Sequence, residues 1–485
     1  MRQLLDVAPV REIQRAYFAL LRSLFGKPFE EMTKHGLSPA AIASHMSGET
    51  RLVEAFASER LEFLQAFIDF WHANHVIVDT YLRSVVTMKS QFGGDISPIV
   101  DLKHFSSTLL YTDTVILQCP LLRLSQVISI GDPANTFRLV VKHALNVMRF
   151  EKLALADVEP PLLVMTGSHV VLDEEYQENL VRQSDTYVLA HAETLFGRSF
   201  STFIELQNYL KEIKTARQAV EVIANPSRAL FDTEWRGSLE EQLTRSSTEL
   251  VAKIGIPEEL RTVGFTLHNT TSGRMLQANE VIMASSLVGA SPLISAPTSW
   301  QYLLWRYEYD AKLVYPELDS ADLVISNAIL TRGERDEVTL ISGLSIESIV
   351  ALRKEGALDA LRALMRKAVK QLDSATPTDL RLVSGQLSRE LGEAFDRHEQ
   401  ELSDVAARKR RFFGVDIGSS LVTGALTIAG AATGNIPLTA FGAVSTSILG
   451  ATSVPAIWKN WKDIQSQQEQ LKRSPAAILM RDVSK

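Results

Sequence analysis

The polar side chains of residues 268–274, HNTTSGR, are the best candidates in this chain for binding a small ligand. The surrounding pattern predicts a strand over 263–267, a polar loop over 268–273 and a helix over 274–288. The first turn of a helix exposes unpaired backbone N–H groups at the positive end of the helix dipole, so it attracts phosphate or carboxylate. The side chains that we expect to assist are Thr270, Thr271, Ser272 and Arg274. The alternative is that a hydroxyl group here only caps the helix.

A second group of candidate ligands lies in DFWHANHVIVD, residues 69–79. Asp69, His72, His75 and Asp79 span an arc of about 120° on a helix, because each residue turns the helix by about 100°. Histidines and carboxylates on one face could bind a metal ion. The same arc is the polar side of an amphipathic helix, and a solvated face explains these side chains without a metal. We therefore predict no metal site and no cofactor.

Acidic residues flank two predicted strands. Asp113 precedes the first, whereas Asp173, Glu174 and Glu175 follow the second. Carboxylates near strand ends could form a two-metal, nuclease-like site, or they could be ordinary loop residues and helix starts. The chain contains no P-loop, nucleophile elbow, HExxH motif or paired-cysteine motif. We therefore name no catalytic residue and lean against enzymatic activity.

The most informative stretch is the apolar segment 412–458, in which the only charged side chain is Asp416. Two blocks, 417–434 and 436–457, are separated by a turn-forming GNIP sequence, and a membrane helix needs roughly 20 apolar residues. Basic residues flank both ends, as expected of a hairpin with both ends in the cytoplasm. The side chains that we expect to contact lipid are Phe412, Phe413, Leu421, Leu426, Phe441, Leu449, Trp458 and Trp461.

The hydropathy of this stretch makes insertion marginal. The five large aliphatic side chains of the first block contribute roughly −2 kcal/mol, and glycine, serine, threonine and Asp416 oppose them. Small residues recur four positions apart, which lets helices approach closely in a bilayer. Such a hairpin suits a segment that is released by a trigger. The alternative is a helical hairpin buried in the protein core or at an oligomer interface.

Composition limits the protein class. A length of 485 residues suggests two to four domains, and a net charge of −7 disfavours broad nucleic-acid binding. A single cysteine, Cys119, excludes an internal disulfide framework and a cysteine-rich zinc site. Charges at Asp6, Arg11 and Glu12 argue against a secretory signal. We therefore expect a cytoplasmic protein that associates with the inner membrane, if at all, through its C-terminal stretch.

The positions of these candidates depend on predicted elements. Residues up to about 95 have helical patterns, with a helix start at Ser38-Pro39 and a long helix over 49–82. Short apolar runs predict strands at 114–119 and 160–167, joined by a helix over 135–153, which is a βαβ unit. The strand at 263–267, the helix after it and a strand at 292–295 predict a second such unit.

The predicted fold is mostly α with a smaller α/β core. It begins with a helical domain, 1–98, followed by the α/β core, 99–345, which carries a helical insertion at about 174–260. A helical region with one long helix, 346–411, leads to the apolar hairpin, 412–458, and to a C-terminal tail, 459–485.

Three passages resemble uncharacterised bacterial proteins of defence and conflict systems. They are LLYTDTVILQCPL, ASSLVGASPLISAP and GLSIESIVALRKEGALDALRALMRKAV, strung along a chain with a C-terminal apolar hairpin. The resemblance implies a bacterial, cytoplasmic setting and a role in phage defence. It has no catalytic motif, so it assigns no functional residue.

Together these features predict a non-enzymatic, membrane-acting effector or regulator. Its expected partners are membrane lipid, a protein encoded nearby and further copies of itself, and no nucleic acid is expected. The alternative is a soluble α/β enzyme or a protein that binds a phosphate or nucleotide ligand, with its site near Asp113, Gly167 and residues 268–274. A third possibility is a structural subunit that binds a partner.

Overall fold

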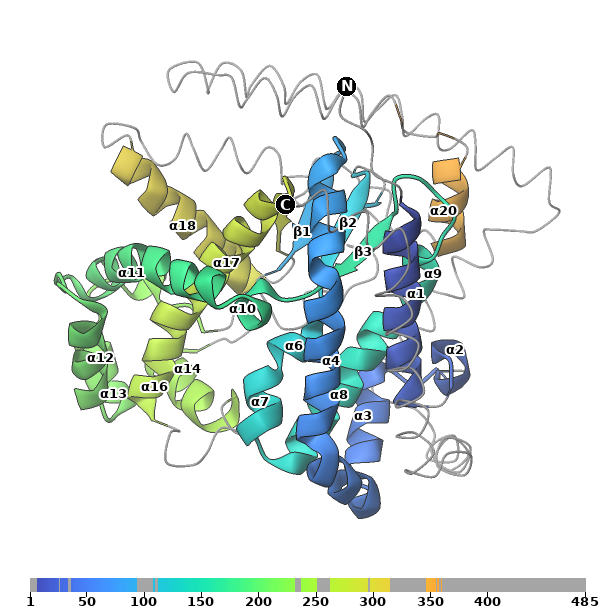
Figure 1. The fold of residues 1–485 in the computed structure, drawn as a ribbon. Coiled ribbons are helices and arrows are strands. Elements are labelled where there is room, and N and C mark those ends of the chain that lie inside the picture. The colour runs from blue at the N-terminus through green and yellow to red at the C-terminus, as the bar shows by residue number, and fades with distance from the viewer. Residues whose placement is uncertain are drawn as a thin grey trace, which may run out of the picture.

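A small parallel sheet surrounded by helices organises the chain (Figure 1). The computed structural model describes residues 7–25, 27–33, 36–93, 108–109, 112–231, 237–250, 262–294, 297–314, 346–354, 356 and 359. Within these ranges the predicted class, mostly α with a smaller α/β core, is confirmed. The predicted long helix from residue 380, the hairpin 412–458 and the tail 459–485 lie outside the described residues.

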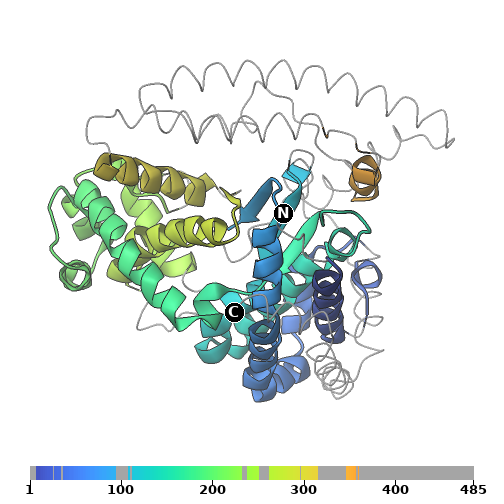
Figure 2. The same ribbon diagram turned by 45° about the horizontal axis from the view of Figure 1, so that its top comes forward.

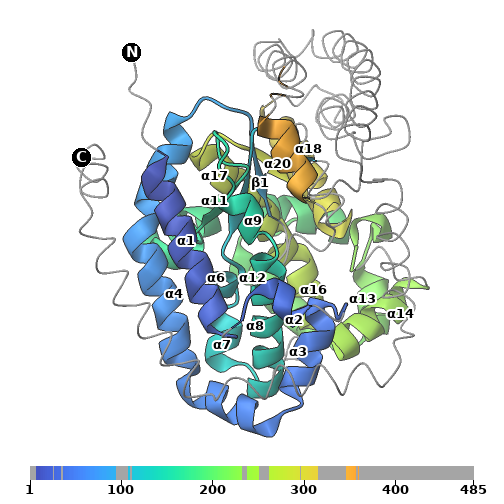
Figure 3. The same cartoon turned by 90° about the vertical axis from the view of Figure 1, so that its right-hand side faces the viewer.

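The described N-terminal residues form helices up to Ser84, as predicted for this region. They are α1 (Ala8–Ser23), α2 (Phe29–Met32), α3 (Pro39–Ser47) and α4 (Thr50–Ser84). The Ser38 hydroxyl accepts the N–H of Ala41 at 3.2 Å, which confirms the predicted helix start. The 35-residue helix α4 buries its aromatic face, including Phe67 and Trp71, and α1 packs along it (Figure 3).

The sheet has the strand order β3-β2-β1-β4, and every described pair is parallel. The strands are β1 (Lys89–Phe92), β2 (Thr114–Gln118), β3 (Leu163–Thr166) and β4 (Ser291–Leu293). Helices α6 (Pro120–Arg123), α7 (Ser125–Ile130), α8 (Pro133–Met148) and α9 (Glu151–Ala154) connect β2 to β3. The βαβ unit predicted for this part of the chain is therefore confirmed.

Strand β1 was not predicted. It lies in a region that we expected to be wholly helical, yet it pairs with β2 on one side and β4 on the other. Its sequence, KSQF, lacks the run of β-branched residues that marks a buried strand. All four residues are nevertheless buried, because the strand is covered in the folded chain. Only its neighbours in space identify it.

The strand predicted over 263–267 is wrong. This segment forms α16 (Val263–His268), which continues through the π-helix η4 (Asn269–Gly273) into α17 (Arg274–Leu287). Thr262 begins the helix by accepting the N–H of Phe265 at 3.1 Å. The second βαβ unit therefore lacks its first strand, although the strand expected at 292–295 is present as β4.

The helical insertion is confirmed in the described part of 174–260. After α10 (His169–Leu172), it contains α11 (Glu174–Phe196), α12 (Phe203–Glu212), α13 (Ala216–Val222), η1 (Pro226–Arg228), α14 (Leu239–Arg245) and the π-helix η2 (Ser246–Leu250). Later come α18 (Pro297–Val314) and α20 (Ile346–Lys354).

The described hydrophobic core consists of two main groups of buried side chains. One surrounds the sheet with residues of α1, α3, α4 and α8, and the other joins α11 to α18. Figures 1 and 2 show the green and yellow helices together on one side of the strands and the blue helices on the other. Helix α17 packs on β1 and β4, so it connects the two groups.

The contact between β1 and α17 requires glycine at residue 93. A Cβ atom added to Gly93 would lie 2.2 Å from Cγ2 of Val281. We expect G93A to lower the free energy of unfolding by about 1–3 kcal/mol, because overpacking strains a core. Urea denaturation measures this loss. V281A removes the methyl group that the added Cβ would meet. The double variant G93A/V281A should therefore lose less unfolding free energy than the sum of the losses of the two single variants. Additive losses would contradict this packing argument.

Candidate functional site

Polar side chains from five helices gather beyond the carboxyl ends of β2 and β3. We call them the carboxyl-end cluster: Asp79 of α4, Arg123 of α6, His169 of α10, Tyr176 of α11 and Glu280 of α17. Helices α6 and α10 start within three residues of the ends of β2 and β3, so these strands place Arg123 and His169 at the same edge of the sheet (Figure 1). Ligands of parallel α/β proteins commonly bind at this edge.

Asp79 and His169 form the most perturbed pair of the cluster. Oδ2 of Asp79 lies 3.5 Å from Nε2 of His169, and their side chains are 3% and 10% exposed. Burial raises the pKa of Asp79 to about 7 and lowers the pKa of His169 to about 4. His169 is therefore uncharged at neutral pH, whereas Asp79 gains and loses a proton there. Within the described residues, Oδ1 of Asp79 has no hydrogen-bond partner.

His75 lies beside this pair, one turn before Asp79 on α4. Its ring centroid is 6.2 Å from that of His169. The Nδ1 atom is 2.9 Å from the carbonyl oxygen of Trp71, which can only accept, so Nδ1–H donates and Nε2 carries the lone pair. Burial lowers the pKa of His75, which favours this neutral form. The neutral His75 ring near His169 therefore has one acceptor atom, Nε2.

Arg123 and Glu280 supply a buried ion pair. Nη2 of Arg123 is 3.1 Å from Oε2 of Glu280, and the two side chains are 9% and 10% exposed. The Tyr176 ring lies against His169, with centroids 5.3 Å apart. Burial and the nearby Glu280 charge raise the pKa of Tyr176, so its hydroxyl keeps its proton. That hydroxyl has no hydrogen-bond partner among the described residues.

The cluster therefore combines two kinds of chemical capacity. Asp79 can accept or release a proton near neutral pH, as a general acid or base must. The unpaired oxygens of Asp79 and Tyr176 can also bond to a group that enters the site. Strongly perturbed pKa values among buried side chains are typical of functional sites, although structural networks also produce them.

The polar face predicted on α4 is divided by the fold. Asp69 and His72 are exposed, as a solvated face requires, and Gln65 donates to Asp69 at 2.9 Å. His75 is half-buried, and Asp79 is only 2% exposed. The interpretation as a solvated face is therefore wrong for Asp79, because α10 packs against α4 and places His169 beside this carboxyl group. No group of three or more His, Cys, Asp or Glu side chains in the described ranges is arranged to hold a metal ion.

The residues predicted to bind an anion occupy a continuous helix. Thr270, Thr271 and Ser272 are buried in η4, and Thr271 donates to the carbonyl oxygen of Leu267 at 2.7 Å. Arg274 donates to the Ser299 hydroxyl of α18 at 2.9 Å. The loop predicted over 268–273 is wrong. The exposed helix N-terminus predicted at residue 274 is also wrong, because α16 and η4 continue directly into α17. The ligand-binding role predicted for Thr270, Thr271, Ser272 and Arg274 therefore loses the support of a helix N-terminus and stays a prediction.

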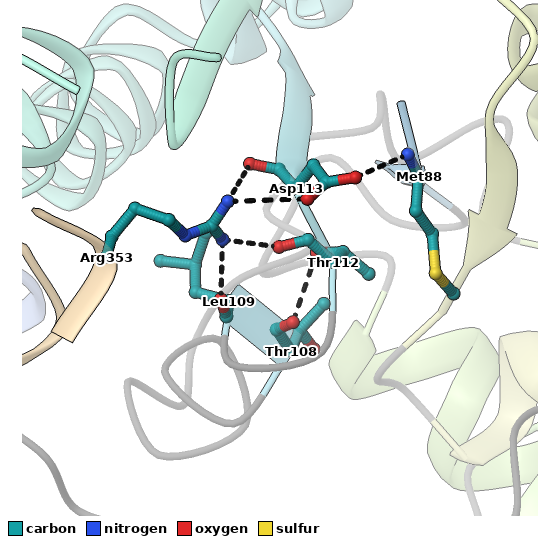
Figure 4. Close-up of polar contacts among 6 residues, drawn as sticks. All are labelled: Met88, Thr108, Leu109, Thr112, Asp113 and Arg353. Atoms are coloured by element: carbon teal, nitrogen blue, oxygen red, sulfur yellow. Dashed lines mark hydrogen bonds and ion pairs between the residues drawn. The ribbon is translucent and has the colours of Figure 1, made fainter. Parts of the chain in front are cut away.

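The acidic residues near the strands lie at opposite edges of the sheet. Asp113 precedes β2, whereas Asp173 follows β3 and caps α11 by accepting the N–H of Tyr176 at 3.0 Å. The interpretation as a two-metal site is therefore wrong. Strands β2 and β3 run in parallel, so a residue before β2 and a residue after β3 lie at opposite ends of the strands. Asp113 instead accepts the N–H of Met88 at 2.8 Å and lies 3.6 Å from Arg353, as Figure 4 shows.

The remaining predicted positions are structural or outside the described ranges. Gly167 packs where an added Cβ would lie 2.5 Å from Leu172, and Cys119 is buried with Tyr17 donating to its sulfur at 3.2 Å. The eight side chains predicted to contact lipid, from Phe412 to Trp461, lie outside the described residues. None of the helices within the described ranges is both long and apolar enough to cross a bilayer.

Comparison of the chain with family models, curated proteins and solved structures gives no match.

The sequence patterns predicted little of the carboxyl-end cluster. Asp79 was singled out by its helix face, but His169, Tyr176, Arg123 and Glu280 were not predicted. Two of them, His169 and Arg123, follow predicted strands closely, and that position was the available indication. Tyr176 and Glu280 come from helices whose placement depends on the whole fold.

The titration of Asp79 predicts a specific pH dependence. An aspartate in an unfolded chain has a pKa of about 3.9. In the folded chain the pKa of Asp79 is about 7. Between these two pKa values Asp79 is protonated in the folded chain but ionised in the unfolded chain. Its contribution to the free energy of unfolding therefore falls as the pH rises through this interval. D79N removes this titration. Relative to the wild type, the free energy of unfolding of D79N should rise by roughly 4 kcal/mol between about pH 4 and about pH 8.

Urea unfolding across this pH range measures the difference between the two proteins. The opposite contribution of His169, whose pKa is lowered, is present in both proteins and largely cancels. D69N, on the exposed side of the same helix, is the matched control and should show little change with pH. A D79N difference that stays constant with pH would contradict the buried, titrating carboxyl.

The Arg123–Glu280 pair predicts a large cost for removing one charge. E280Q leaves the Arg123 guanidinium buried without its counter-charge, so unfolding should become easier by about 3–5 kcal/mol. The double change R123M/E280L should cost much less, because it removes both charges. R217Q disrupts an exposed pair, whose side chains are 81% and 64% exposed, and should cost at most about 1 kcal/mol. Equal losses for E280Q and R217Q in urea denaturation would contradict this assignment.

Proposed function

We propose that this chain is a non-enzymatic, membrane-acting effector or regulator with an α/β body that senses a signal. The observation that carries the membrane role is the apolar segment 412–458, with Arg408–Arg411 before it and Lys459 and Lys462 after it. Cationic flanks and interfacial aromatic residues favour a hairpin with both ends on one side of a bilayer. Its marginal hydropathy favours release on activation over constitutive anchoring.

The carboxyl-end cluster supports a sensing role for the body. It contains a buried carboxyl group that titrates near neutral pH and two oxygens without a hydrogen-bond partner in the described part of the chain, at the edge where parallel sheets commonly bind ligands. A bound ligand or a gained proton at Asp79 would change the charge balance between α4, α10 and α11. Such a change is a physical means of linking the site to the packing of these helices.

The proposed setting is the bacterial cytoplasm with access to the inner membrane, and the proposed process is defence against phage. The resemblance of the three passages to defence-associated proteins supports this setting. The proposed partners are membrane lipid, a protein encoded nearby and further copies of the chain. A net charge of −7 disfavours nucleic acid as a partner, and no cofactor is proposed.

A second candidate function is a soluble α/β enzyme or ligand-binding protein. The Asp79–His169 pair favours it, because a carboxyl group with a pKa of about 7 is suited to general acid–base catalysis. The segment 412–458 would then belong to the core or to an oligomer interface. Thermal-shift screening with nucleotides and divalent ions tests this candidate: a shift that D79N abolishes supports it, and no shift with any of them counts against it.

The membrane role predicts activity on vesicles. Full-length protein should bind vesicles of phosphatidylethanolamine and phosphatidylglycerol and release an entrapped dye. L421D/L426D should weaken both effects at least about a hundredfold, because each aspartate costs about 2.5–3.5 kcal/mol within a bilayer. L61D, at an exposed leucine of α4, is the matched control and should behave as wild type. Absence of binding and release by the wild type, at low and neutral pH, would count against the membrane role.

A further inference from the structure

Helices α1, α3, α4 and α8 enclose an apolar cavity in the part of the core that surrounds the sheet. The cavity has a volume of about 50 Å³ and lies between the end of α1, α3, the first half of α4 and α8, which Figure 3 shows packed together. Ten side chains line it and all of them are apolar, among them Met46, Ala55, Phe56, Phe63, Phe137 and Val140. The cavity is therefore chemically unlike the carboxyl-end cluster.

The cavity has an aromatic wall and a partly exposed end. The ring centroid of Phe56 lies 6.0 Å from that of Phe63 and 5.3 Å from that of Phe137. Phe56 and Phe63 are fully buried, whereas Phe137 and Ala55 are half-buried. The core therefore forms the enclosed end of the cavity, and the half-buried residues mark the end at which a molecule can enter from solvent.

The lining decides which chemistry the cavity accepts. Its volume exceeds the roughly 10–15 Å³ that one water molecule needs, but a buried water also needs about 2–4 polar partners. The ten side chains offer no N–H group, hydroxyl group or carbonyl oxygen. An apolar group loses no hydrogen bond here and gains the dispersion contacts that an empty cavity lacks. An apolar occupant is therefore favoured over water or a polar ligand.

The volume also limits the size of the occupant. An apolar cavity of about 150 Å³ binds benzene, and this cavity is about a third as large, so it fits the end of an aliphatic chain better than an aromatic ring. A diacyl lipid would have to withdraw both chains from its bilayer, and each methylene withdrawn costs roughly fourfold in the binding equilibrium. A cavity that takes only a few carbon atoms cannot offset this cost. A free single-chain amphiphile is therefore the better match.

We propose that this cavity binds the aliphatic end of a free single-chain amphiphile, such as a fatty acid, and leaves the polar head group in solvent. Phe63 and Asp79 both belong to α4 and are separated by about 24 Å along the helix axis. The cavity is therefore a ligand site separate from the carboxyl-end cluster. The inference goes beyond the proposed membrane function and rests on none of the residues 412–458.

The test uses full-length protein with decanoate and 1-decanol as probes, below the concentrations at which they aggregate. Saturation-transfer NMR should label the terminal methyl protons more strongly than the methylene protons next to the head group, because the chain end contacts the protein. The two probes should bind with affinities within about threefold of each other, because a head group in solvent is screened from the charges of the protein.

Two substitutions change the cavity in opposite directions. V140A frees the space of two carbon atoms and should tighten decanoate binding about tenfold, because each further methylene buried is worth roughly fourfold. A55L fills the cavity with added carbon atoms and should weaken binding at least about tenfold for the same reason. V181A and V181L, at an exposed valine of α11, are the matched controls and should bind as wild type. Should A55L fail to fold, V140A still supplies the comparison.

Three results would overturn the proposal. Equal labelling along the chain, or wild-type affinity in both V140A and A55L, would place the probe elsewhere on the protein. Loss of binding in L421D/L426D would assign the probe to the segment 412–458 instead. Dissociation of an oligomer by decanoate, seen by analytical ultracentrifugation, would show that a second copy of the chain occupies the cavity.

The cavity and the membrane function can fail separately. Wild-type binding of decanoate by L421D/L426D supports the cavity as the site. The same result without dye release from vesicles by the wild type would count against the membrane function alone.

Discussion

The parallel pairing of β1 with both β2 and β4 is the constraint on which the rest of the structure depends. Parallel strands cannot be joined by a tight turn, so each connection must cross over the sheet. Strand β1 is separated by 21 residues from β2, which begins at Thr114, and by nearly 200 residues from β4, which begins at Ser291. The helical insertion is accommodated within that second connection, and α17 returns the chain to the sheet.

This constraint gives the sheet two chemically different edges. All described strands point the same way, so their carboxyl ends share one edge and their amino ends the other. The carboxyl edge holds Asp79, His169 and the Arg123–Glu280 pair. The amino edge holds Asp113 and the guanidinium group of Arg353. One edge thus carries the proposed sensing site and the other carries the attachment of α20, with the four strands between them.

Burial also explains why these charges behave differently. Arg123 with Glu280, and Arg353 with Asp113, each bury opposite charges together, which offsets part of the cost of desolvation. Asp79 is equally buried but faces His169, whose own burial keeps it neutral. Asp79 therefore responds to desolvation by holding its proton up to about pH 7. A paired charge fixes structure, whereas an unpaired one makes the local charge depend on pH.

The sequence by itself determined the parts of the fold that depend on local pattern. Apolar periodicity predicted α4, a capping serine before proline predicted the start of α3, and short apolar runs predicted β2, β3 and β4. Tertiary structure alone decided that KSQF is a central strand and that 263–273 is helical, since neither segment has a local pattern strong enough to override its surroundings. It also decided the candidate site: Asp79, Arg123, His169, Tyr176 and Glu280 are up to 201 residues apart in the chain. Their protonation and pairing arise from burial, and burial is a property of the packed chain.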